Sequence, residues 1–145
     1  MRNGWLRRHD VTVAEIQRLL HVVDRDLSDA RTTGLSVDGR FQHAYDAALQ
    51  LCEIPLRACG YEVTKATGHH KHGIDSLRLT LGDCWSETAD YIERCSRLRA
   101  QVVYERVGAV SEEDATDLLE MAEHLRSDII DWLRDQHAEL LPPGM

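Results

Sequence analysis

Apolar residues recur at intervals of three and four positions along most of the chain, and this spacing constrains its fold more than any other feature. An α-helix has about 3.6 residues per turn, so residues with this spacing form one apolar stripe on a helix. Such a stripe must be buried against other helices. The chain is therefore predicted to be all-α. The first such series is Val13, Ile16, Leu20, Val23, Leu27 and Ala30.

Capping residues and helix breakers predict where the helices begin and end. Thr12 followed by Glu15 has the pattern of a capping box. Pro55 is expected to kink its helix near Leu51, after which the helix resumes until Gly60. The expected helices run from Thr12 to about Thr33, from Ser36 or Asp38 to about Cys59, from Ile74 to Leu81, from Ser86 to about Arg106, and from Ser111 through Trp132.

Four long helices and one short helix joined by brief connections predict an up-and-down bundle. With 145 residues, the chain is long enough for one domain with a single core, expected over about residues 11–135. Residues 1–11 are expected to be irregular or a short helical turn, with Trp5 and Leu6 covering the core, and residues 61–68 to be a connection.

The charge of the chain limits what it can bind. The net charge is −8 and the sequence pI is about 5.4, which argues against an unspecific nucleic-acid coat, because phosphate binding requires many cations. Only Lys65 and Lys71 are lysines, so nearly all positive charge is arginine, which makes forked contacts to phosphate. Any anion site must be local.

The cysteines and histidines do not predict a metal site. Cys52, Cys59, Cys84 and Cys95 lack any Cys-x-x-Cys pair and are expected to be reduced core thiols. His69 and His70 belong to a histidine cluster, but adjacent residues of a helix cannot both face one ion; either could instead point into an anion site. We expect no metal and no cofactor. With no signal peptide and no apolar segment long enough to span a membrane, the protein is expected in the cytoplasm.

One polar row lies beside an apolar one in the fourth expected helix. The polar row consists of Arg94, Arg97, Gln101 and Tyr104. The neighbouring apolar row is Tyr91, Cys95, Leu98 and Val102. Packing does not account for the polar row, which makes it the candidate ligand site.

The first helix carries a second charged group, which we expect to be a solvated outer face rather than a site. Its members are Asp24, Arg25, Asp26 and Asp29.

The order of several landmarks resembles the HEPN superfamily, the helical "higher eukaryotes and prokaryotes nucleotide-binding" domains. The similar region runs from about Val11 to Trp132. The landmarks are Asp24-Arg25-Asp26-Leu27-x-x-Ala30, Phe41-x-x-Ala44-Tyr45-x-Ala47-Ala48, Gly60-Tyr61, Gly68-His69-His70 and Arg97-Leu98-Arg99 before Tyr104.

This resemblance implies a helical bundle that forms a homodimer, in a toxin-antitoxin-like branch whose members often pair with a nucleotidyltransferase antitoxin. Many members have an Arg and a His four to six residues later, which form a metal-independent endoribonuclease site across the dimer. Arg97 or Arg99 stands in the place of that Arg, and Tyr104 in the place of the His. Arg97 shares a helix face with Tyr104, whereas Arg99 lies roughly 140° away.

Two positions depart from the family signature. An unperturbed phenol titrates near about pH 10, so Tyr104 is a poor substitute for histidine as a base near neutral pH. Ala100 follows Arg99 where a polar residue is expected. The resemblance therefore predicts a catalytically degenerate HEPN module that binds a nucleotide, RNA or a nucleotidyltransferase partner. The alternatives are a HEPN-type endoribonuclease toxin and a structural helical dimer without a ligand.

Overall fold

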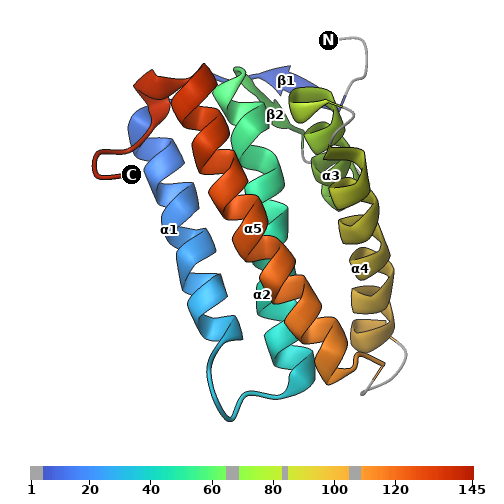
Figure 1. Cartoon of the computed structure of the whole chain (residues 1–145). Coiled ribbons are helices and arrows are strands. Elements are labelled where there is room, and N and C mark those ends of the chain that lie inside the picture. The colour runs from blue at the N-terminus through green and yellow to red at the C-terminus, as the bar shows by residue number, and fades with distance from the viewer. Residues whose placement is uncertain (1–4, 65–68, 83–84, 105–108) are drawn as a thin grey trace.

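The computed structural model describes residues 5–64, 69–82, 85–104 and 109–145, which form a helical bundle (Figure 1). A two-stranded antiparallel ribbon, β1 with β2, lies at one end of it. The predicted all-α bundle is confirmed. The elements are β1 (Leu6–Arg8), α1 (Val13–Ala30), α2 (Val37–Ala58), β2 (Tyr61–Val63), α3 (His69–Leu81), α4 (Ser86–Tyr104), α5 (Glu112–Gln136) and a 3-10 helix (Ala138–Leu140).

Helix α2 is the centre of the bundle. It packs most extensively against α1 and α5, and it also contacts α3 and α4. Apolar side chains on several sides of α2 are fully buried, among them Phe41, Ala48, Leu51 and Ile54. A helix that is apolar on several sides is stable only when other helices surround it. In the described part of the chain, every helix is too short or too polar to cross a lipid bilayer.

Side chains cap the helices at three of the predicted starts. The Oγ1 of Thr12 accepts a hydrogen bond from the Glu15 amide at 3.2 Å, and Ser36 caps α2 through the Gly39 amide at 3.0 Å. At α5, Ser111 and Asp114 form a reciprocal capping box. The predicted Thr12 capping box is only half formed, since the Glu15 carboxylate binds His9 and Arg57.

Other predicted boundaries need correction. Helix α3 begins at His69 rather than Ile74, so the predicted short helix is longer. Residues 6–8 and 61–63 were expected to be irregular or a connection, yet they pair as strands, because Leu6 and Val63 bury each other's apolar faces against Leu56. The predicted end of the second helix is confirmed, since α2 continues past Pro55 to Ala58, with Cys59 as its C-cap. Helix α4 is described only to Tyr104, so its expected end at Arg106 lies outside the described residues.

The cysteine prediction is correct for two thiols. Cys52 and Cys95 are buried and free. Cys59 is also free but exposed, because it follows the last residue of α2 and leaves the core there. Cys84 lies outside the described residues.

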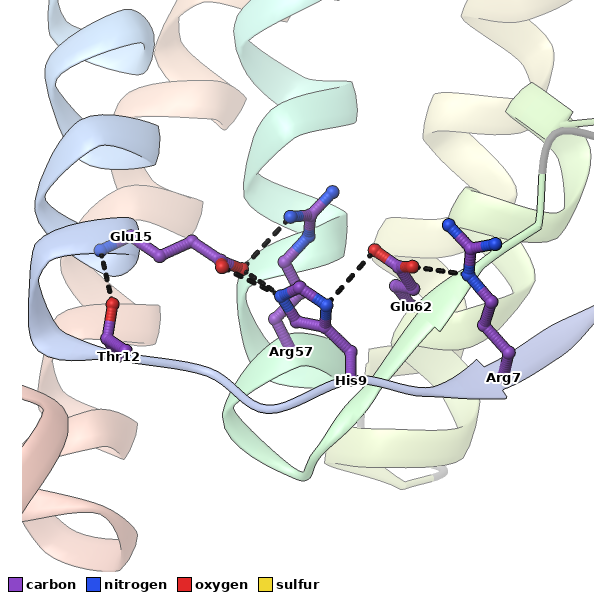
Figure 2. Close-up of polar contacts among 6 residues, drawn as sticks. All are labelled: Arg7, His9, Thr12, Glu15, Arg57 and Glu62. Carbon is purple, nitrogen blue, oxygen red and sulfur yellow. Dashed lines mark hydrogen bonds and ion pairs between the residues drawn. The ribbon is translucent and has the colours of Figure 1, made fainter.

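A network of charged side chains ties the N-terminal segment to the bundle (Figure 2). His9 Nε2 lies 2.6 Å from Glu15 Oε2, and its Nδ1 lies 3.3 Å from Glu62 Oε2. Arg57 of α2 donates to Glu15 at 3.0 Å, and Arg7 pairs with Glu62. The network joins β1, α1, α2 and β2, so it holds the ribbon on the end of the bundle.

Glu15→Gln should lower the free energy of unfolding by about 1–2 kcal/mol at pH 7, because it removes charge-assisted hydrogen bonds from a largely buried carboxylate. Burial raises the pKa of Glu15, but hydrogen bonds from Arg57 and His9 outweigh it, and the pKa is lowered from its ordinary value. Because the pKa of Glu15 is lower in the folded state than in the unfolded state, its ionised form stabilises the fold at pH values above the unfolded-state pKa. This stabilisation is lost as the pH falls through the folded-state pKa.

Urea unfolding from neutral to acidic pH measures this effect. The difference in free energy of unfolding between wild type and Glu15→Gln should become smaller as the pH drops below about 4.5, the ordinary pKa of Glu. Glu120→Gln, at an exposed position of α5, is the control and should change stability little. A difference in free energy of unfolding that stays constant down to acidic pH would contradict the prediction.

Candidate functional site

A groove opens beside α4, facing the N-terminal part of α5; we name it the α4–α5 groove. Its volume is about 440 Å³, within the range of small-ligand sites. Phe41 of α2 and Leu98 of α4 contribute apolar surface. The polar lining comes from Arg94, Arg97 and Gln101 on α4 and from Asp114 and Asp117 on α5.

The helical spacing of α4 brings three residues of the predicted polar row into this groove. Arg94, Arg97 and Gln101 are separated by three and four residues, so they lie on one face of the helix, and all three side chains are exposed. The Arg97 side chain is 67% exposed, and its closest carboxylate contact is Glu93 at 4.0 Å. Such an exposed pair contributes little, so the guanidinium remains free to bind an anion.

Arg94 is held against an aromatic ring. Its Cζ lies 5.6 Å from the centre of the Tyr91 ring, a cation-π contact that orients the guanidinium. Among the described residues, no carboxylate forms an ion pair with Arg94. Within the described part of the chain, therefore, no carboxylate lies closer than 4.0 Å to either guanidinium of the groove.

The opposite wall is acidic. Asp114 accepts a hydrogen bond from the Ser111 amide at 3.0 Å, which positions its carboxylate in the first turn of α5. Asp117 lies about one turn further along the helix and is exposed. Carboxylates repel phosphate but accept hydrogen bonds from hydroxyl and amino groups. The groove therefore suits a ligand with an anionic end and hydrogen-bond donors elsewhere.

Two protonated groups line the groove between these walls. Burial raises the pKa of Tyr91, and nearby Cys95, Asp117 and Asp114 raise it further. Burial also raises the pKa of the Cys95 thiol to about 11, although a hydrogen bond with Tyr91 partly opposes this shift. Neither side chain is a base or a thiolate nucleophile at neutral pH.

Arg99 lies on a different side of α4. Its Cζ is 5.7 Å from the centre of the Tyr45 ring of α2. The pKa of nearby Asp46 is raised by burial. A hydrogen bond from Gln42 and the charge of Arg99 oppose this shift only in part. Arg99 therefore contacts α2, whereas Arg97 lines the groove, and the structure does not bring the two candidate arginines together.

The remaining predicted site residues are not described in full. Tyr104 ends α4, and His69 and His70 begin α3, but the side chains of all three lie outside the described residues. His72 of the same histidine cluster stacks on Trp5, with ring centres 4.8 Å apart. A packing role therefore accounts for one histidine of the cluster.

Comparison with known proteins adds no assignment. No family model matches the chain, and neither does any curated protein or solved structure. The geometry of the groove and the chemistry of its side chains therefore carry the functional argument.

Sequence reasoning missed the acidic wall and placed one aspartate incorrectly. The sequence presents Asp114 only as one of three acidic residues in the first turn of a helix, where they suit the helix dipole; that it also faces α4 depends on how the two helices pack. Asp26 was expected on a solvated face, but it is only 6% exposed. A signal for its burial existed, since Asp26 follows Val23 by three positions and precedes Ala30 by four, which places it on the apolar stripe.

Proposed function

We propose that the protein is a non-catalytic nucleotide- or RNA-binding module that holds its ligand in the α4–α5 groove. The observation that carries this proposal is the pair Arg94 and Arg97 at the edge of a groove of about 440 Å³ that also has apolar surface. Guanidinium groups bind phosphate through forked, charge-assisted hydrogen bonds. A nucleotide combines such a phosphate with a flat base.

The other lining residues suit the rest of a nucleotide. Leu98 and Tyr91, both partly buried, offer an apolar surface and an aromatic ring to the face of a base, above the buried Phe41. Asp114 and Asp117 can accept hydrogen bonds from ribose hydroxyls or from exocyclic amino groups. The cationic wall and the acidic wall would thereby orient the bound ligand, with its phosphate on the α4 side.

The resemblance to HEPN domains supports the same proposal. It places the ligand on the helix that contains Arg94 and Arg97, and it adds two partners to the proposal: a second copy of the chain and a nucleotidyltransferase antitoxin. A homodimer would bring the polar rows of two protomers into one binding surface. Sedimentation that finds only a 16.5 kDa particle at micromolar concentration would contradict the dimer.

The protonation state of two side chains in the groove favours ligand binding over RNA cleavage as the function. Tyr91 and Cys95 keep their protons at neutral pH, because burial raises both pKa values. Among the described residues that line the groove there is no histidine, and the carboxylates Asp114 and Asp117 lie on the α5 side, away from the arginines proposed to hold the phosphate. Metal-independent cleavage of RNA needs a group that takes the proton of the attacking ribose hydroxyl. Endoribonuclease activity is therefore the alternative to the proposed binding function.

Titration of a short fluorescein-labelled single-stranded RNA, and of ATP in competition, tests the proposal. Wild type should bind, Arg97→Ala should bind about 10-fold more weakly, and binding should weaken between about 50 and 200 mM salt. Arg18→Ala, at an exposed arginine of α1, is the control and should bind like wild type. No binding to either probe at low salt would overturn the proposal.

The same RNA reports on catalysis. Intact RNA after prolonged incubation with bound wild-type protein is the expected result. Cleavage that disappears in Arg97→Ala would establish the endoribonuclease alternative instead. Cleavage that persists in Arg97→Ala would place the activity outside the groove.

A further inference from the structure

Three side chains of types that can ligate a metal ion lie close together where α1 packs against α2. They are Asp26 and Asp29, one turn apart on α1, and His43 on α2. One ligand atom of each lies within 4.8 Å of the other two. This cluster shares no residue with the α4–α5 groove.

The distances within the cluster approach those around a bound ion. His43 Nδ1 lies 3.4 Å from Asp26 Oδ1 and 3.9 Å from Asp29 Oδ2. Ligand atoms at about 2.0–2.2 Å from a first-row metal ion lie roughly 3.0–3.5 Å from one another. Small side-chain rotations would therefore give all three atoms a common centre.

Asp26 provides an independent reason to expect a cation. Its side chain is only 8% exposed, and the described part of the chain contains no arginine or lysine that pairs with it. Among the described residues, the one polar contact of its side chain is the long one to His43. A buried carboxylate is costly unless it is paired with a cation or bound to a metal. Asp29 and Asp46 add further negative charge, which the long contact to His43 offsets only in part.

The exposure of the three residues allows an ion to enter. Side-chain exposure rises from 8% at Asp26 to 34% at His43 and 47% at Asp29. The cluster is therefore buried at one side and open to solvent at the other. Three protein ligands also leave coordination positions for water or for a small anionic ligand.

We propose that Asp26, Asp29 and His43 form a binding site for one divalent transition-metal ion. Imidazole favours Zn²⁺ and the ions near it in the first transition row over Mg²⁺ or Ca²⁺, while the two carboxylates also suit Mn²⁺. Zn²⁺ is therefore the first probe. The bound ion would join α1 to α2 and neutralise the buried charge of Asp26.

Calorimetric titration of ZnCl₂ into the EDTA-treated, dialysed full chain tests the proposal. Wild type should bind one ion per chain, and Asp29→Asn and His43→Ala should each lower the affinity by about 100-fold. Because Asp29 is half exposed, Asp29→Asn is expected to fold like wild type. His124→Ala is the control, since His124 is an exposed histidine beside Glu120 and Glu123 on α5.

Two further readouts separate a metal site from a simple ion pair between His43 and Asp26. Zn²⁺ well above the wild-type dissociation constant should raise the melting temperature of wild type by about 5–10 °C and that of Asp29→Asn clearly less. Co²⁺ used in place of Zn²⁺ should show visible absorption bands in wild type that are lost in His43→Ala. MgCl₂ should not compete with Zn²⁺.

Several results would overturn the proposal. Absence of Zn²⁺ binding to wild type would show that the cluster is only an ion pair. Unchanged affinity in both Asp29→Asn and His43→Ala would place the ion elsewhere. Loss of binding when His69, His70 and His72 are replaced by alanine, with His43 intact, would assign it to the N-terminal part of α3.

Discussion

Leu51→Ala should lower the free energy of unfolding by about 3–4 kcal/mol and the melting temperature by about 10 °C. Leu51 is fully buried in the middle of α2, the helix that contacts α1, α3, α4 and α5. Truncation removes apolar contacts and leaves a cavity that the surrounding helices can close only partly, because they are held by their other contacts. Urea unfolding followed by circular dichroism measures the loss.

Leu79→Ala is the matched control. It removes the same atoms from another helix, but Leu79 is 60% exposed, so the expected change is within about 0.5 kcal/mol. Equal losses for the two variants would show that α2 is not the centre of the bundle. A small loss for Leu51→Ala alone would mean that the core can repack around it.

Replacing both Arg94 and Arg97 with glutamate should weaken RNA binding at least about 100-fold, because each arginine contributes charge-assisted hydrogen bonds of about 1.5–3 kcal/mol and each glutamate repels phosphate. The helix should tolerate the change, since both side chains are exposed and neither is part of the core. Fluorescence anisotropy with labelled RNA measures the affinity, and circular dichroism confirms the fold. The salt dependence should also flatten, because fewer counterions are released.

The control reverses the charge of two arginines that lie outside the α4–α5 groove. Arg8→Glu with Arg18→Glu produces the same change in net charge at exposed positions of β1 and α1. If binding depends on the α4–α5 groove, the control should bind far more tightly than the groove variant. If both double variants weaken binding equally, the protein attracts RNA through its overall charge and the groove has no special role.

Much of the fold was predictable because helical periodicity is a local property. The spacing of Ile16, Leu20 and Val23 identifies the buried face of α1 without knowledge of its partner. Capping residues act within one helical turn, so Ser111 was identified correctly, and Ser36 was one of the two candidates for the start of α2. The β1–β2 ribbon was missed, since two segments of three residues pair only because Leu6 and Val63 meet Leu56 in the folded chain.

The candidate site was predictable on one helix only. Arg94, Arg97 and Gln101 share a face of α4, and their spacing is enough to show this. The acidic wall could not be predicted, because Asp114 and Asp117 reach the groove only through the packing of α5 in the bundle. The separate position of Arg99 follows from the helix geometry, but its contact with Tyr45 does not.

The sequence by itself determined that this protein is a set of amphipathic helices, with a row of arginines on one of them. Both are properties of residues a few positions apart. Only the tertiary structure decided which side chains from different helices meet: Asp117 lines the same groove as Arg97, and His43 lies beside Asp26. The physical reason is that helix packing depends on the combined shape and apolar area of all the faces, whereas a helix stripe depends on its own residues alone.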